Sequence, residues 1–415
     1  MSLSDVSKYF NENSLDEIIR KVGGVRHTSY EFAKTSEKKG DSYLSVVRRL
    51  KVCGVDVNDK PLAINVIIKS IPDNVSRRKL FRSADFFRNE IHFYENVLPA
   101  FEEFQRSKNP KNPFTEYPRC LLSHCDGEND FIALENINFL GYISPDRQSC
   151  ITLTDCLLII KTLGRFHGLS VAFRDQEPDN FDKAANCLEE VYYSERLRPW
   201  YTKFLDDAML VARDAVSKTF PNSKYEELTN KYLSEGLYSD QIDLVSKKSR
   251  FSVVGHGDCW SPNFMTKFDG ETALAIKIID FQLARYASFA LDFMFFIYSC
   301  TSQELREKHF EEIFEAYHAS AADIVKDLGS DPEKMFPIKE VRQELTEFGR
   351  FGCGMGIESL PMSMMEDEDV ADLDALTIAD PVLTDVWKIY PFKEEFKRRR
   401  IAECLKHGID SGFIV

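Results

Sequence analysis

Asp258, Asn263 and Asp280 have side chains whose order and spacing fit phosphoryl transfer. Asp258 precedes Asn263 by five positions, the spacing between the catalytic aspartate and the metal-binding asparagine in the protein-kinase loop H-R-D-x-x-x-x-N. Asp280 begins the tripeptide D-F-Q, which takes the place of the kinase D-F-G. Mg²⁺ prefers oxygen ligands and usually takes one or two of them from protein. The pattern therefore predicts Asp258 as the catalytic carboxylate, Asn263 and Asp280 as magnesium ligands, and ATP as the phosphoryl donor.

A strand and a hairpin must bring these three residues together. A short apolar segment leads into the loop that contains Asp258, and residues 264–268 and 273–279 are typical of two strands joined by a D-G turn. Residues just before the first strand of a hairpin lie opposite residues just after the second. We therefore expect Asn263 and Asp280 to meet at one end of the hairpin, beside the Asp258 loop.

The N-terminal half contains a candidate lysine–glutamate pair. Lys69 lies in an apolar strand predicted over 62–71, and Glu90 follows 21 residues later in a helix predicted over 76–104. In kinases such a pair holds the lysine against the phosphates of ATP. The spacing predicts that Lys69 and Glu90 bind nucleotide in this way.

A turn that could cover the phosphates is expected at Gly40, Asp41 and Ser42, just before the first strand of the sheet. A single glycine makes this a weak pattern on its own. The sequence contains neither G-x-x-x-x-G-K-[ST] nor G-x-G-x-x-G, which argues against P-loop and dinucleotide-binding folds.

The composition is that of a globular protein with 43% hydrophobic and 29% charged residues over 415 positions. The net charge of −14 argues against non-specific nucleic-acid binding. Ten cysteines without a C-x-x-C pair favour reduced thiols, and the N-terminus lacks a signal-peptide pattern, so we expect a cytoplasmic protein. The longest strongly apolar run, 289–300, is too short to cross a bilayer, so no membrane partner is expected. No sequence feature fixes an oligomeric state.

The sequence pattern changes from β-rich to α-rich near residue 138. This change predicts an α+β architecture with two lobes, a β-rich N-lobe over 1–137 and a mainly helical C-lobe over 138–415. The N-lobe would hold the nucleotide-covering turn and the lysine–glutamate pair. The C-lobe would hold the catalytic loop, the metal ligands and the pocket for the acceptor substrate.

Seven stretches of this sequence together resemble the ecdysteroid-kinase-like (CHK kinase-like) family, whose relatives are the choline kinases and the aminoglycoside phosphotransferases. The likeness covers nearly the whole chain. Its motifs are GDSYLS at 40–45, NEIHFYENVLP at 89–99, LENI at 134–137, LGRFHGLS at 163–170, HGDCWSPN at 256–263, DFQLARY at 280–286 and ALD at 290–292.

The resemblance implies a protein-kinase-like fold and an ATP- and Mg²⁺-dependent kinase that phosphorylates a hydroxyl of a small molecule, an ecdysteroid or a hydroxylated xenobiotic. It also implies a hinge beside adenine at Glu135, Asn136 and Ile137. Asp292 would brace the catalytic loop. One departure from the family is that Gly164 and Gly168 stand where alanine is common, which is a change in packing and not in chemistry.

Three other functions compete with this interpretation. A protein kinase is disfavoured because few residues separate Asp280 from the next apolar helix and no A-P-E follows. A choline or ethanolamine kinase remains open, because the 32 Phe and 16 Tyr could build a cation pocket or simply a core. A non-catalytic binding protein with a kinase fold is the third alternative, against which the intact Lys69, Asp258, Asn263 and Asp280 argue.

Overall fold

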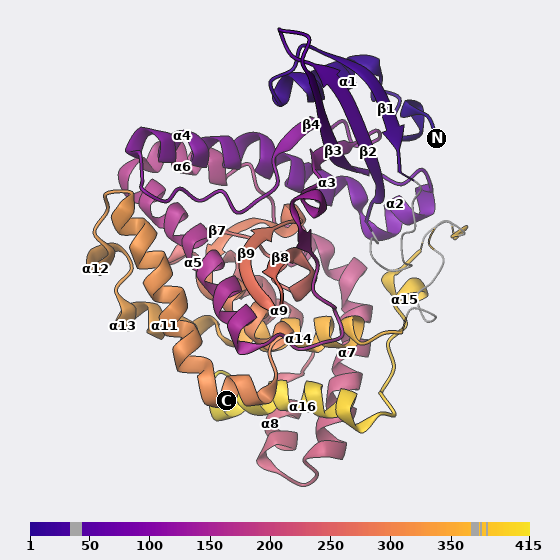
Figure 1. Cartoon of the computed structure of the whole chain (residues 1–415). Helices are drawn as coiled ribbons and strands as arrows, with labels where there is room; N and C mark the ends of the chain where they lie inside the picture. The colour runs from indigo at the N-terminus through magenta and orange to yellow at the C-terminus, as the bar shows by residue number, and fades with distance from the viewer. Residues whose placement is uncertain (34–43, 367–372, 374–375, 379–380) are drawn as a thin grey trace.

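The chain folds into a β-sheet lobe at one end and a larger helical body, as the computed structural model in Figure 1 shows. The structure describes residues 1–33, 44–366, 373, 376–378 and 381–415. The predicted phosphate-covering turn, Gly40, Asp41 and Ser42, lies outside these described residues.

The N-lobe is built on a five-stranded antiparallel sheet with the order β1-β2-β3-β5-β4. One face is covered by α1 (Glu12–Lys21), and the two share a hydrophobic core that includes Leu15, Ile19, Val52 and Ile68. The central strand β3 pairs with β2 along its whole length and with β5 over its second half. The strands are β1 (Arg26–Phe32), β2 (Val46–Val55), β3 (Pro61–Ser70), β4 (Cys120–His124) and β5 (Phe131–Glu135).

The prediction of a single helix over 76–104 is wrong, because the segment is interrupted. The segment forms α2 (Val75–Phe81), α3 (Ser83–His92), a π-helical turn and α4 (Leu98–Lys108). Arg82 adopts a left-handed backbone conformation with φ of 51°, which ends α2 and begins α3 in a new direction. The backbone stays helical from Ser83 to Lys108, and Pro99 lies two residues after the π-helical turn within that stretch. The break at Arg82 therefore separates α2 from this stretch, in which α3 packs against residues 281–283 and α4 extends over the helical body (Figure 1).

The C-lobe is organised around α5 (Leu153–Gln176), which packs along α11 (Gln303–Asp327). A Cβ at Gly164 would lie 2.5 Å from the carbonyl oxygen of Tyr317, and one at Gly168 would lie 2.6 Å from that of Ala321. Glycine at these two positions therefore allows the two helices to approach closely. Of the helices in the described part of the chain, α5 is the one that is long and apolar enough to cross a membrane, but 78% of its most apolar window is buried in the fold.

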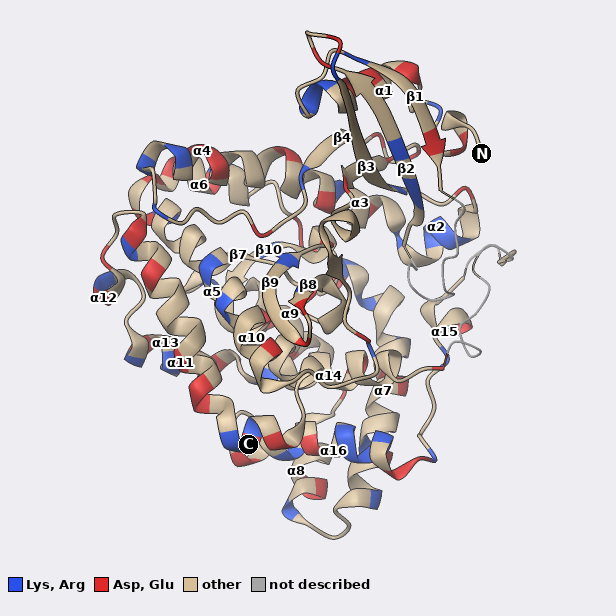
Figure 2. Cartoon of the chain, in the orientation of Figure 1, with Lys and Arg blue, Asp and Glu red and all other residues tan. Residues whose placement is uncertain are grey.

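The remaining helices surround this pair, and α10 runs through the middle with every residue buried. The outer helices α4, α11 and α16 carry many of the charged residues seen in Figure 2. The other helices are α6 (Pro178–Ala185), α7 (Arg198–Thr219), α8 (Lys224–Tyr232), α9 (Leu237–Ser246), α10 (Phe289–Cys300), α12 (Pro332–Met335), α13 (Ile338–Phe348), α14 (Arg350–Ser363), α15 (Leu383–Val386) and α16 (Glu395–Asp410).

Two small sheets lie in the C-lobe near the N-lobe. The predicted hairpin forms as β8 (Phe264–Asp269) and β9 (Thr272–Ile278), and β8 also pairs with the short strand β6 (Tyr142–Ile143). The strand before the Asp258 loop, β7 (Ser252–Gly255), pairs with β10 (Arg285–Ser288). The prediction of an α+β, protein-kinase-like fold with a β-rich N-lobe and a mainly helical C-lobe is confirmed. The lobe boundary at residues 137 and 138 stays a prediction, and the chain leaves the large sheet at Glu135.

Candidate active site

The loop that carries Asp258 is held in place by a buried carboxylate. Asp292, near the start of α10, accepts hydrogen bonds from the backbone N–H groups of His256 and Gly257, the latter at 2.9 Å. Its Oδ2 also accepts from Nε2 of His167 at 3.1 Å, and the hydroxyl of Tyr317 lies 2.7 Å from the other ring nitrogen of His167. Burial alone would raise the pKa of Asp292, but these hydrogen bonds hold it below its ordinary value. Asp292 is therefore a fixed negative anchor for the loop.

Gly257 gives this loop its sharp turn. Its φ is +81°, a region that side chains rarely adopt, and a Cβ there would overlap the carbonyl oxygen of Leu283. The close approach of Gly257 to Leu283 places the Asp258 loop directly against the segment that follows Asp280.

Gly257→Ala is expected to lower the free energy of unfolding by about 3 kcal/mol, because both the backbone conformation and the steric overlap oppose a methyl group. Urea denaturation measures this loss. Gly270→Ala is the matched control, since Gly270 also has a positive φ of +59° but no neighbouring atom within 4 Å of the added Cβ. A loss of about 1 kcal/mol is expected for the control, and equal losses in the two variants would contradict the predicted overlap.

His256 fixes the backbone on both sides of the site. Its Nε2 donates to the carbonyl oxygen of Ile279 at 2.8 Å, and its Nδ1 accepts from the backbone N–H of Asp258 at 3.2 Å. Burial lowers the pKa of His256, which keeps the ring neutral with its proton on Nε2. Burial also raises the pKa of Asp258, against the opposing effect of His256. A carboxylate with a raised pKa is a better proton acceptor.

The hairpin brings Asn263 and Asp280 to the same end, as predicted. The backbone N–H of Ile279 donates to the carbonyl oxygen of Asn263 at 3.0 Å, and Asp280 follows directly. The side chain of Asn263 donates to the carbonyl oxygen of Asp258, also at 3.0 Å. Gln282 approaches the Asp258 carboxylate at 3.5 Å, a long and weak contact. The three residues chosen from the sequence therefore converge on one place.

Lys69 joins this group from the N-lobe. Its Nζ lies 2.8 Å from Oε1 of Glu90 and 3.2 Å from Oε2, and it also forms an ion pair with Oδ1 of Asp280. Glu90 is 3% exposed, so its carboxylate is buried against this lysine. The predicted Lys69–Glu90 pair is present in the structure and reaches across to the hairpin.

The residues after Asp280 pack into the core of the molecule. Asp280 has a left-handed backbone conformation with φ of 66°, which turns Phe281 inward. Phe281 stacks on Phe93 with a centroid separation of 3.8 Å and meets Tyr94 edge to face. Because Phe93 directly follows α3, this stack links the segment carrying Asp280 to the helix carrying Glu90.

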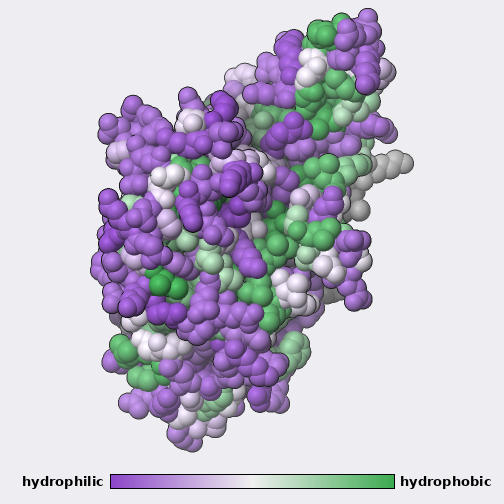
Figure 3. Space-filling view, turned by 60° about the vertical axis from the view of Figure 1, so that its left-hand side comes forward, coloured by the Kyte–Doolittle hydropathy of each residue, from purple (hydrophilic) through white to green (hydrophobic). Residues whose placement is uncertain are grey.

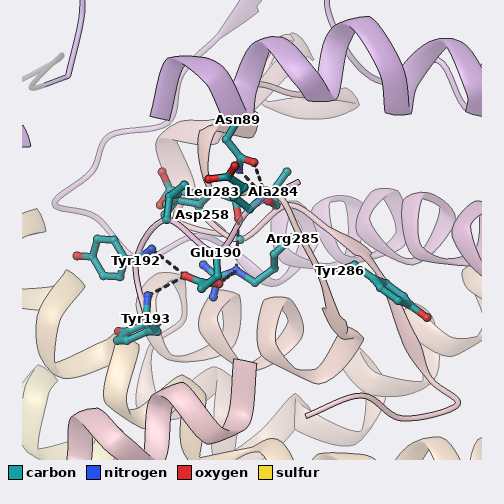
Figure 4. A network of polar contacts seen from close by, with 12 residues as sticks. Asn89, Glu190, Tyr192, Tyr193, Asp258, Leu283, Ala284, Arg285 and Tyr286 are labelled. Carbon is teal, nitrogen blue, oxygen red and sulfur yellow. Dashed lines mark hydrogen bonds and ion pairs between the residues drawn. The ribbon is translucent and has the colours of Figure 1, made fainter. Parts of the chain in front are cut away.

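A second, polar link lies beside the aromatic one, and sequence reasoning missed it. Asn89 donates from Nδ2 to the carbonyl oxygens of Gln282 at 3.0 Å and Ala284 at 2.9 Å. Its Oδ1 accepts from the backbone N–H of Glu189 at 3.0 Å. Figure 4 shows Asn89 above this segment and Arg285 reaching toward Glu190 below it. Asn89 therefore ties α3, the Asp280 segment and the loop before α7 together.

A pocket of about 230 Å³ opens next to these residues. Lys69, Asp258 and Asp280 line it together with a wall of large apolar and aromatic side chains. Sequence reasoning did not predict its members on α14, of which Glu358 is the carboxylate. The apolar and aromatic members are Leu44, Val47, Phe81, Phe86, Tyr192, Trp200, Phe204, Trp260, Leu283, Phe295, Met355, Met362 and Trp387.

The surface seen in Figure 3 is mostly hydrophilic, with hydrophobic residues gathered below the protruding N-lobe.

The predicted hinge residues lie at the end of β5. Glu135 pairs with Arg119 at 3.0 Å, Asn136 caps the short helical turn after it, and Ile137 is buried. Within the described residues, none of the three lines the pocket beside Asp258. The assignment of Glu135, Asn136 and Ile137 to adenine binding stays a prediction.

The oxygen atoms at the hairpin end suit a magnesium ion. Oδ1 of Asp280 pairs with Lys69, and across the described residues no hydrogen bond engages Oδ2 of Asp280 or Oδ1 of Asn263. Within the same residues, no group of three or more His, Cys, Asp or Glu side chains forms a metal cage. Two protein oxygens, with the remaining ligands from phosphates and water, are what proteins commonly offer Mg²⁺.

Glu358 is a buried carboxyl of the pocket with a raised pKa. It is 3% exposed, and burial raises its pKa to about 8, against hydrogen bonds from Tyr201 and Tyr193. We therefore expect a stability difference between the wild-type protein and Glu358→Gln that depends on pH. The folded protein keeps a proton that the unfolded chain, with the ordinary pKa of 4.5, has released.

The free energy of unfolding of the wild-type protein should fall, relative to Glu358→Gln, as pH rises from about 5 to about 8, by up to about 1.4 kcal/mol per pH unit. Denaturation at a series of pH values measures this slope. A constant difference between the two proteins over this range would contradict the raised pKa.

The chain is similar to solved structures of small-molecule kinases. An ethanolamine kinase from Plasmodium vivax aligns with 14% identity and a TM-score of 0.38 over 81% of this chain and 77% of that one. Aminoglycoside 2′-phosphotransferase-IIIa, in a GDP complex, aligns with 14% identity and a TM-score of 0.36 over 84% of this chain and 95% of that one. A comparison with the curated proteins finds no match.

The model of the ecdysteroid kinase-like family matches residues 39–330. The match includes Lys69, Glu90, Asp258, Asn263 and Asp280, and it extends over more than half of the chain. The resemblance that the sequence motifs suggested is confirmed, and the protein belongs to the ecdysteroid kinase-like family.

Proposed function

We propose that the protein transfers the γ-phosphoryl group of ATP, with Mg²⁺, to a hydroxyl of a small apolar molecule, an ecdysteroid or a hydroxylated xenobiotic. The observation that carries this proposal is the convergence of Asp258, Asp280 and Lys69 on the lining of one aromatic pocket. The charged groups suit a triphosphate, and the aromatic wall suits an apolar acceptor.

Each of the polar residues has a distinct task in this proposal. Asp258 orients the acceptor hydroxyl and takes its proton, for which burial of the carboxyl is favourable. Lys69, held by Glu90, contacts the phosphates. Asn263 and Asp280 would hold Mg²⁺, which supplies charge neutralisation at the phosphates.

A small acceptor fits the structure better than a peptide. Strand β10 leads without a loop into α10, so only residues 281–288 separate Asp280 from the helix. Protein kinases need a longer activation segment at this point to support a peptide substrate.

We also propose that the protein works in a reducing compartment such as the cytoplasm, and the ten free cysteines support this location.

The direct test is a search by mass spectrometry for alcohols that gain a phosphate when incubated with the protein, ATP and Mg²⁺. Ecdysteroids and hydroxylated xenobiotics should gain 80 mass units, and omission of Mg²⁺ should stop the reaction. Absence of any phosphorylated product across both classes, with ATP still bound, would favour the non-catalytic alternative.

A further inference from the structure

Of the four acidic or basic side chains among the described residues that line the pocket, Glu358 is the one outside the proposed phosphate site. The other three are Lys69, Asp258 and Asp280. Glu358 lies on α14, among apolar neighbours such as Met355 and Met362. A carboxyl group is rarely buried without a specific role or partner.

The carboxyl of Glu358 is held in a defined position by two tyrosines. The hydroxyl of Tyr193 lies 2.9 Å from Oε1 and 3.1 Å from Oε2, and the hydroxyl of Tyr201 donates to Oε2. Both tyrosines are buried, and no Lys or Arg contacts Glu358 within the described residues. The group is therefore fixed by neutral donors and is not neutralised by an ion pair.

The tyrosine loop is itself anchored to the segment that carries Asp280. Oε1 of Glu190 accepts from the backbone N–H groups of Tyr192 at 2.8 Å and Tyr193 at 2.7 Å. The other carboxylate oxygen of Glu190 lies 3.3 Å from Nε of Arg285, five residues after Asp280. Figure 4 shows Glu190 between the two tyrosines and Arg285. Glu358 is therefore positioned, through Tyr193, relative to the proposed reaction centre.

Glu358 and Asp258 line the same pocket, and Tyr192, next to the tyrosine that holds Glu358, lines it with them. A ligand that presents one hydroxyl to Asp258 has Glu358 as a second polar group to meet.

We propose that Glu358 is a specificity-determining residue of the acceptor site, where it hydrogen-bonds a second polar group of a neutral, largely apolar alcohol. This inference rests on the proposed function and narrows its substrate class to apolar molecules with two separated polar groups. Since burial keeps Glu358 protonated at neutral pH, its carboxyl can both donate and accept, and it offers no full charge to a cationic alcohol. Aromatic rings attract a cation by themselves, but a neutral Glu358 adds no charge to that attraction.

Binding of paired probes without nucleotide tests this inference separately from catalysis. The probes are androstanediol, with a hydroxyl at each end, the matching androstanol with one hydroxyl, and choline. All three tryptophans of the chain, Trp200, Trp260 and Trp387, line the pocket, so intrinsic fluorescence reports occupancy. We expect the wild-type protein to bind the diol about tenfold more tightly than the mono-alcohol, and choline more weakly than either.

Substitutions then assign the difference to Glu358. Glu358→Leu should bind the diol and the mono-alcohol with about equal affinity. Glu358→Gln keeps a donor and an acceptor, so its ratio of the two affinities should stay within about threefold of the wild-type ratio. Glu344→Leu is the matched control, because Glu344 is also buried and accepts from two hydroxyls, those of Ser249 and Ser288, both at 2.6 Å, but does not line the pocket. Its diol preference should equal that of the wild-type protein.

The inference is overturned by equal binding of diol and mono-alcohol to the wild-type protein, by no binding of either, or by tighter binding of choline. It is also overturned if Glu358→Leu keeps the wild-type preference. If Glu358→Leu does not fold, the affinity ratios of the wild-type protein and of Glu358→Gln test the inference instead. Loss of the diol preference in folded Glu358→Gln would then count against the proposed hydrogen bond of Glu358. A retained preference without any phosphoryl transfer would refute the proposed function and leave the acceptor site standing.

Discussion

Asp258→Asn is expected to reduce phosphoryl transfer about a thousandfold while ATP binding stays within about twofold of the wild-type value. The amide keeps the size of the carboxyl but cannot accept the proton of the acceptor hydroxyl. The backbone contacts of Asp258 with His256 and Asn263 remain, because they involve its N–H and its carbonyl oxygen. Steady-state turnover with an identified acceptor, and calorimetry with ATP and Mg²⁺, measure the two quantities.

Asp130→Asn is the matched control for this variant. Asp130 is a buried aspartate whose pKa burial raises, as it does for Asp258, and its Oδ1 accepts from the backbone N–H groups of Asp126 and Gly127 in the turn before β5, outside the pocket lining. The control should retain turnover. Near-normal turnover of Asp258→Asn would remove Asp258 from the catalytic role.

Asp280→Ala is expected to weaken Mg²⁺-dependent ATP binding by about a hundredfold, because it removes the carboxylate of the two proposed magnesium ligands and leaves Asn263 as the other. Binding of ATP in the absence of Mg²⁺ should change much less, since Lys69 keeps its contact with Glu90. Calorimetry with and without Mg²⁺ separates the two effects.

Asp240→Ala serves as the comparison for Asp280→Ala. It also breaks an ion pair, the bidentate one with Arg350 at 2.6 and 2.7 Å in the C-lobe, but it lies outside the pocket lining. If both variants bind ATP with the same Mg²⁺ dependence as the wild-type protein, Asp280 is not a metal ligand.

The core of the candidate site was predictable because short-range geometry fixes it. A hairpin places the residue before its first strand opposite the residue after its second, so Asn263 and Asp280 had to meet. The Lys69–Glu90 pair followed from a strand and a helix of recognisable periodicity. In each case the residues that determine the contact lie within a few positions of it, or on regular elements.

The parts that were missed depend on contacts between distant segments. The break at Arg82 leaves no signature in the helical pattern, and the guanidinium is held by Asp85 and by the carbonyl oxygen of Val191, more than a hundred positions away. In the sequence, Glu358 appears only as a single acidic residue in an otherwise apolar helical segment. Its partners Tyr193 and Tyr201 are 165 and 157 positions away, so only the folded chain shows that they meet.

The stack of Phe281 on Phe93 has a consequence for the position of Asp280. The two rings, with Tyr94 and Phe166, belong to the same buried core as the central helices of the C-lobe. Moving Asp280 out of the site, and Phe281 with it, would expose this aromatic cluster to water, which is costly. On the proposed function, we therefore expect Asp280 to keep its place in the site with and without bound substrates.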